Sequence, residues 1–136
     1  MKKVLLALCL SSLSLASAAA PVVIANSAGP DALSQADVKK LFLGKLKKLP
    51  NGAEPLVIEY NEGDALRASF HELVSGKTEA QLQAYWSKLI FTGKAKPPQT
   101  VASASVAVAQ VSANANAIGY VDEADVTGAV KVVFKP

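Results

Sequence analysis

Residues 55–70 read Pro55-Leu56-Val57-Ile58-Glu59-Tyr60-Asn61-Glu62-Gly63-Asp64-Ala65-Leu66-Arg67-Ala68-Ser69-Phe70. The first five residues form a short β-rich run. After the turn at Gly63, apolar residues recur at the spacing of a buried helix face, at Leu66, Phe70, Leu73 and Val74. The sequence therefore predicts a strand, a tight turn and a helix that begins at or near Asp64.

Such a junction directs unpaired backbone N–H groups and the positive end of a helix dipole toward one point. That point is suited to an anion, and Arg67 in the first turn adds a charge that binds oxyanions. The predicted ligand-binding residues are Gly63, Asp64, Ala65, Leu66 and Arg67, with Ser69 as a weaker helper and Ser27 contributing from the first loop. An ordinary strand-to-helix turn capped by Asp64 remains the alternative.

The N-terminal residues have the pattern of a secretory signal peptide. Lys2 and Lys3 precede an apolar run at 4–15, and Ala16-Ser17-Ala18 forms a small-residue cleavage signal. We expect cleavage after Ala18, so that residues 1–18 are the signal peptide and residues 19–136 the periplasmic domain. The alternative of lipidation at Cys9 is disfavoured, because bulky Leu8 precedes that cysteine. Cleavage removes the only cysteine, which excludes disulfides and thiol chemistry from the mature chain.

Charge gives few indications of a partner. Removing Lys2 and Lys3 from the 14 Lys and Arg leaves 12 against 11 Asp and Glu, a net charge of +1. We therefore expect no nucleic-acid binding and, after signal cleavage, no membrane insertion. Five lysines within ten residues form a basic patch that suits either a solvated surface or a docking surface: Lys39, Lys40, Lys45, Lys47 and Lys48.

The rest of the chain alternates strands with helices. Strands are predicted at 22–26, 117–121 and 130–134, and a short turn or helix at 122–126. Helices are predicted from Ser34 to Gly44, from Thr78 to Gly93 with Tyr85 and Trp86 in the core, and from Ser103 or Ser105 to about Ala113. The segment 94–100 reads as a loop. This alternation predicts an α/β domain with a mixed or parallel sheet and helices on both faces.

An enzyme is not indicated. His71 is the only histidine, and one helical turn after Arg67 it either shares an anion or, as we prefer, faces solvent. No Ser-His-Asp or metal-ligand spacing is visible, so no catalytic residue, metal or cofactor is predicted. Asp122, Glu123 and Asp125 read as a solvated turn.

Four segments together resemble a known family: Leu41-Phe42-Leu43-Gly44-Lys45, the turn and helix from Gly63 to Phe70, Tyr85-Trp86, and Ala117-Ile118-Gly119-Tyr120-Val121. They are similar to the PstS-like phosphate-binding periplasmic proteins of ABC importers, and most of all to their small single-lobe relatives. The resemblance implies a single lobe of the type II periplasmic-binding-protein-like fold, located in the periplasm. It also implies phosphate or a similar oxyanion as ligand, and an ABC permease or another envelope protein as partner.

The family's phosphate loop reads Arg-x-x-Gly-Ser-Gly-Thr-Arg, and the chain departs from it. Gly63 matches the first glycine and Arg67 the final arginine, but other positions hold Tyr60, Asp64, Ala65 and Leu66. Two hydroxyl donors are lost and a carboxylate stands at the predicted N-cap, where it competes for the same N–H groups. Two functions stay open: oxyanion binding linked to ABC transport or sensing, or a degenerate lobe that acts as a protein-interaction module in the cell envelope.

Overall fold

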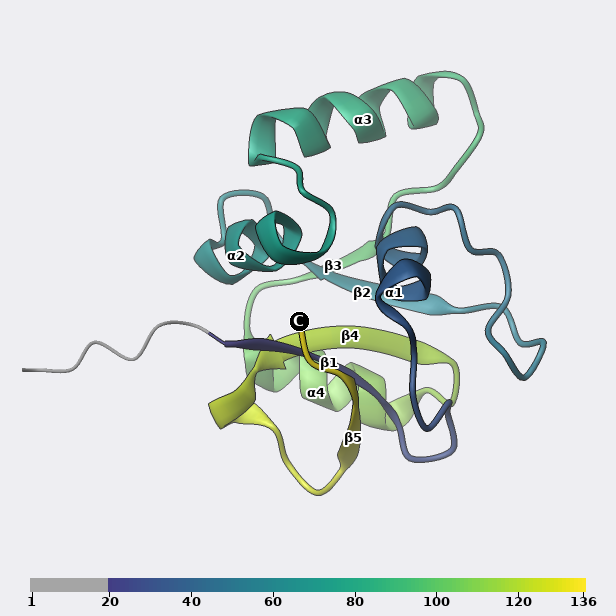
Figure 1. The fold of residues 1–136 in the computed structure, drawn as a ribbon, viewed down its shortest axis with the longest axis vertical. Coiled ribbons are helices and arrows are strands. Elements are labelled where there is room, and N and C mark those ends of the chain that lie inside the picture. The colour runs from purple at the N-terminus through teal and green to yellow at the C-terminus, as the bar shows by residue number, and fades with distance from the viewer. Residues whose placement is uncertain (1–19) are drawn as a thin grey trace, which may run out of the picture.

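A five-stranded mixed sheet forms the centre of the computed structural model, which describes residues 20–136 (Figure 1). The strands are β1 (Pro21–Asn26), β2 (Leu56–Tyr60), β3 (Gln99–Val101), β4 (Ala117–Asp122) and β5 (Val130–Phe134). Their order in the sheet is β3-β2-β4-β1-β5. β2 runs parallel to β3 and β4, whereas β1 runs antiparallel to both of its neighbours, β4 and β5. The predicted α/β class with a mixed sheet is confirmed.

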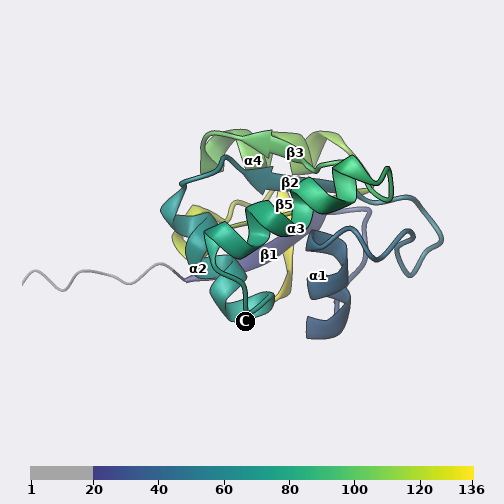
Figure 2. The same ribbon diagram turned by 90° about the horizontal axis from the view of Figure 1, so that it is seen from above.

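The structure has four α-helices: α1 (Gln35–Phe42), α2 (Ala65–Val74), α3 (Glu79–Phe91) and α4 (Ala104–Ala113). The view in Figure 2 places α4 on one side of the strands and α1 and α2 on the other, so helices cover both faces as predicted. A 3-10 turn, η1 (Glu123–Asp125), follows β4. Within the part of the chain that the structure describes, no helix combines the length and apolar character needed to cross a membrane.

Local sequence signals set the helix boundaries. The side chains of Ser34, Asp64, Thr78 and Ser103 each cap a helix by accepting a backbone N–H, and Thr78 forms a complete capping box with Gln81. The predicted loop at 94–100 is partly wrong, because its end pairs with β2 as the short strand β3. The predicted signal peptide, residues 1–18, lies outside the described residues.

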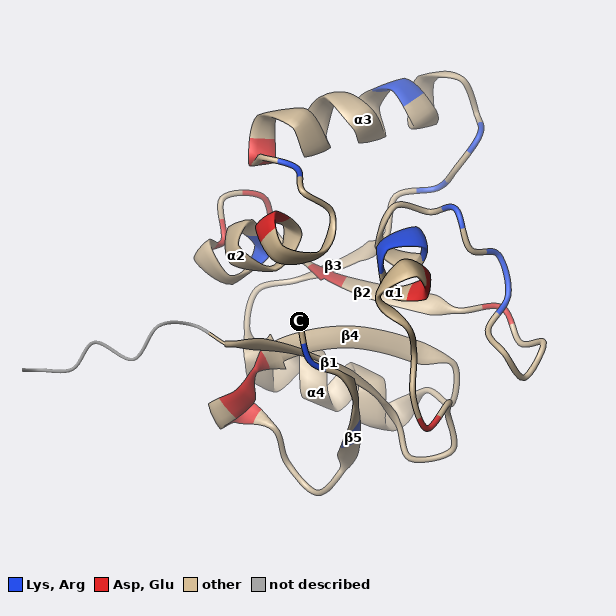
Figure 3. Ribbon diagram, viewed as in Figure 1, with Lys and Arg blue, Asp and Glu red and all other residues tan. Residues whose placement is uncertain are grey.

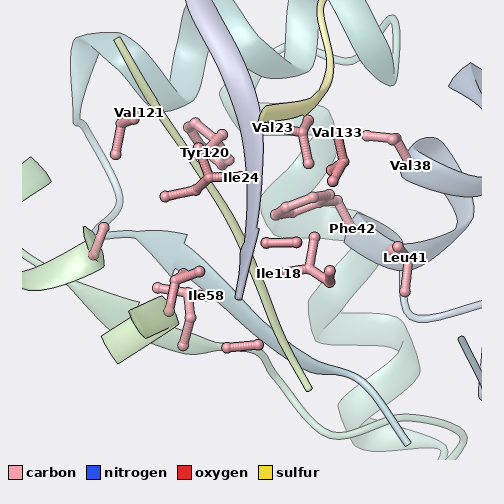
Figure 4. Packing of buried hydrophobic residues seen from close by; sticks show 14 of the residues in the cluster. Val23, Ile24, Val38, Leu41, Phe42, Ile58, Ile118, Tyr120, Val121 and Val133 are labelled. Carbon is pink, nitrogen blue, oxygen red and sulfur yellow. The ribbon is translucent and has the colours of Figure 1, made fainter. Parts of the chain in front are cut away.

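The core lies between the sheet and α1, α2 and α4, and Figure 4 shows part of it. Ile24, Ile118 and Phe42 are fully buried. The ring of Phe70 stacks on that of Tyr120, with centroids 3.8 Å apart. This stacking fixes α2 against β4 and thereby positions the start of α2.

The faces of α2 and α3 differ from the predicted ones. The buried residues of α2 are Arg67, Phe70, His71 and Val74, whereas Leu73 is 53% exposed. Two polar side chains thus occupy the inward face, and the prediction of a solvent-facing His71 is wrong. The predicted core face of α3 is confirmed only in part, because Leu82 is its one fully buried residue while Tyr85 and Trp86 are half-buried.

Candidate functional site

The turn between β2 and α2 has the predicted backbone geometry. Gly63 adopts a φ of +84°, which favours glycine, and the N–H of Asp64 donates to the carbonyl of Asn61 at 3.2 Å. The chain then enters α2 directly, so that the first N–H groups of the helix face the carboxyl end of β2. In open α/β sheets, ligands bind outside the carboxyl ends of the strands.

The Asp64 side chain occupies part of this helix N-terminus. Its Oδ1 accepts the N–H of Leu66 at 2.8 Å, as an N-cap carboxylate does. A bound oxyanion would use the same donor. The N-cap alternative considered for this turn is therefore present in the folded chain.

Arg67 lies inward, not over the helix N-terminus. Its Nε donates to Oε2 of Glu79 at 3.1 Å, and its Nη1 donates to the carbonyl of Tyr60 at 2.9 Å. The residue is 5% exposed. Glu79 is the first residue of α3, so the ion pair also ties α3 to α2. The guanidinium charge that an oxyanion would need is neutralised by a carboxylate of the chain itself.

Carboxylates gather around the end of β2. Burial is the main cause that raises the pKa of Tyr60 well above its ordinary value, and the negative charges of Asp64, Asp125, Glu59 and Asp122 raise it further. All four carboxylates therefore lie close enough to the end of β2 for their charges to act on Tyr60. Figure 3 shows acidic segments at this end of the sheet, while most lysine segments lie around α1 and the end of α3. Each of these carboxylates would repel an anion bound at the turn.

A buried polar network lies directly beneath the turn, and sequence reasoning missed it. The carboxylate of Glu59 accepts hydrogen bonds from the Tyr60 N–H at 2.9 Å and from the Tyr120 hydroxyl, and contacts Nε2 of His71 at 2.7 Å. Nδ1 of His71 lies 2.9 Å from Oγ of Ser75. All of these residues are at most 6% exposed. The available signal was a carboxylate in an otherwise apolar strand.

The structure does not bring Ser27 together with the other predicted site residues. Ala25 of β1 and Val57 of β2 both pair with Ile118 of β4, so the end of β1 is level with the start of β2. Ser27 follows β1 and therefore lies at the opposite end of the sheet from Gly63. Among residues 20–136, no group of three His, Cys, Asp or Glu side chains is placed to hold a metal ion.

No family model and no curated protein matches the chain. Solved structures do match. An ABC-type phosphate transport receptor from Vibrio cholerae has a TM-score of 0.67 and 17% identity, over 85% of this chain and 45% of that one. A putative phosphate ABC transporter substrate-binding protein with bound phosphate from Clostridium perfringens has a TM-score of 0.67 and 21% identity, over 85% and 44%. PstS from Borrelia burgdorferi has a TM-score of 0.62 and 13% identity, over 85% and 46%.

The fold is that of one lobe of a periplasmic binding protein. The predicted resemblance to PstS-like proteins is thereby confirmed at the level of structure. At these identities the likeness concerns the fold alone, and the chain spans less than half the length of the proteins that it matches.

Proposed function

We propose that this chain is a solute-binding-type lobe that acts as an interaction module in the cell envelope, without holding a small oxyanion of its own. One observation carries the proposal: the two strongest groups of the candidate anion site are already engaged. Arg67 is paired with Glu79, and the Leu66 N–H is bound by Asp64.

The energetics support the same proposal. A carboxylate about 4 Å from a bound anion repels it by roughly 4 kcal/mol per unit charge pair at an effective dielectric of about 20. Releasing Arg67 would in addition leave Glu79 without its partner. A single lobe also leaves a bound ion open to water on one side, which weakens every hydrogen bond to it.

The sequence pattern supports a location for the chain, and the fold supports a class of partner. The signal-peptide pattern of residues 1–18 supports an extracytoplasmic location, and the kinship in fold with transport receptors supports an ABC permease or another envelope protein as partner. The proposal includes no catalysis and no nucleic-acid binding.

Titration calorimetry of residues 19–136 with inorganic phosphate tests the proposal. The wild-type chain is expected to give no binding heat and no thermal shift at millimolar phosphate. Saturable binding that is lost in Arg67→Gln would overturn the proposal. As a matched comparison, Asp64→Ser restores a hydroxyl donor and removes the repelling charge, and it is the variant in which phosphate binding should first appear.

A second candidate function is oxyanion binding at the start of α2, linked to transport or sensing. It is favoured by the fold shared with phosphate receptors, one of which holds phosphate. Backbone N–H groups of Gly63, Asp64, Ala65 and Leu66 would act with Arg67, and Ser27 would reach the ion only from another chain. The phosphate titration described above decides between the two candidates.

A further inference from the structure

A wide cleft lies at the end of the sheet opposite the candidate anion site. It has a volume of about 800 Å³ and is open to solvent on one side. Its apolar lining includes Leu41 and Leu46 from α1 and the following loop, Leu56 from the start of β2, and Trp86 and Ile90 from α3. Because these side chains come from separate parts of the sequence, only the folded chain forms the cleft.

The geometry around Trp86 indicates a formed wall. A Cβ atom built on Gly44 would lie 2.9 Å from Cη2 of Trp86, so the indole packs directly on the glycine backbone. The hydroxyl of Tyr85 donates to the carbonyl of Leu43 at 2.6 Å and holds α3 against the end of α1. Packing of Trp86 and the hydrogen bond of Tyr85 thus fix the distance between α3 and the end of α1, which form two walls of the cleft.

The rim of the cleft is basic. Lys47, Lys94 and Lys96 line it, against one carboxylate, that of Glu54. All three lysines are exposed, and none of them forms an ion pair within residues 20–136. Figure 3 shows lysine segments in the loop after α1 and in the loop after α3. An apolar floor with uncompensated positive charges at its edge is complementary to an apolar group that carries carboxylates.

Two exposed apolar side chains lie at the end of α3, one in the cleft lining and one beside it in sequence. Ile90 is 48% exposed, and its neighbour Phe91, at the end of α3, is 91% exposed. Phe91 does not line the cleft, so a small molecule held there would leave it in water, whereas a polypeptide that continued past the end of α3 would be long enough to reach it. Two-fold pairing of two copies through this face would bring lysines against lysines, which disfavours a second copy as the occupant.

We propose that this cleft docks an acidic segment of a partner protein, with an apolar side chain against Trp86 and carboxylates paired with Lys47, Lys94 and Lys96. This inference rests on the proposed function as an interaction module, because it identifies the docking surface and the chemistry of the partner. It places the contact at the lysine-rich end of the lobe, away from α2.

Synthetic peptides test the inference, with the fluorescence of Trp86, the only tryptophan of the chain, as readout. The probe is a short peptide in which Asp and Glu alternate with Leu and Phe. It is compared with a twin that has Lys in place of every acidic residue and with a twin that has Ser in place of every apolar one. We expect saturable binding of the first peptide alone, weakened about tenfold or more by the combined change Lys47→Glu, Lys94→Glu and Lys96→Glu.

A matched charge change controls for unspecific attraction. Lys39→Glu, Lys40→Glu and Lys48→Glu alter three exposed lysines that do not line the cleft, and binding should stay within about twofold. Equal binding of the twin peptides, or an equal loss in this control, would overturn the inference. The inference would also be overturned if phosphatidylglycerol vesicles or dodecanoate bound more strongly than the acidic peptide, or if sedimentation showed that the chain self-associates.

The two proposals fail in different ways. Phosphate binding at α2 would refute the interaction module whatever the peptides do. If neither the peptide nor phosphate binds, only the assignment of the cleft as the docking surface is refuted. Circular dichroism of each variant verifies that the chain is folded.

Discussion

The buried contact between Glu59 and His71 should be energetically coupled, and a double-mutant cycle measures the coupling. The perturbations are Glu59→Leu, His71→Phe and both together. Glu59→Leu leaves the Tyr120 hydroxyl and His71 without their acceptor, whereas His71→Phe removes one of the three partners of the Glu59 carboxylate. Both side chains are 2% exposed, so water cannot replace a lost partner.

The expected magnitudes follow from this burial. Leaving a buried hydrogen-bonding group without its partner costs about 1–3 kcal/mol, and more where the group left behind is charged. Glu59→Leu should lie near the top of that range and His71→Phe near the bottom, since the carboxylate keeps two donors. The double variant removes both groups at once, so its cost should fall short of the sum by about 2 kcal/mol or more.

Urea unfolding followed by Trp86 fluorescence and by far-ultraviolet circular dichroism gives the free energies of unfolding. If Glu59→Leu does not fold, Glu59→Gln keeps the shape of the side chain and completes the cycle. The exposed pair of Lys135 and Glu123 serves as control and should couple by less than about 1 kcal/mol. Costs that add to within about 0.5 kcal/mol for Glu59 and His71 would refute the argument that the network acts as one unit.

Three further predictions concern stability. Tyr60→Phe should raise the free energy of unfolding by about 1 kcal/mol in thermal melts, because its hydroxyl is buried without a hydrogen-bond partner in the described residues. Gly44→Ala should lower the free energy of unfolding by about 1–2 kcal/mol, because Gly44 has a φ of +70°, and should shift the emission of Trp86, because the new Cβ would clash with the indole. Gly63→Ala, at a φ of +84° with open space around it, should lower the free energy of unfolding through the backbone alone. Above pH 10 the protein should lose stability, because burial raises the pKa values of Tyr60 and Tyr120 from the ordinary 10.0 and the unfolded chain therefore releases these protons first. The urea midpoints measured between about pH 8 and 11 should fall as pH rises, and they should fall less steeply in Tyr60→Phe.

The local pattern of the sequence determined the elements of this protein. Helix starts at Ser34, Thr78 and Asp64 depend on a side chain and a backbone N–H within three residues of each other, so they can be predicted without tertiary information. The strand-turn-helix at Gly63 followed for the same reason. The short strand β3 was not predicted, because three residues become a strand only when β2 is available to pair with them.

The tertiary structure alone decided what the candidate site contains. Helical periodicity indicates which residues share a face, but not how far the helix is rotated about its axis, and packing of Phe70 on Tyr120 turned Arg67 and His71 inward. The partner of Arg67 is Glu79 on the next helix, and the partner of His71 is Glu59 on a strand. Ser27 and Gly63 were separated by the direction of β1, which depends on pairing between strands far apart in the chain. Charges and hydrogen bonds of a site are set by such long-range neighbours, and the order of residues along the chain does not fix them.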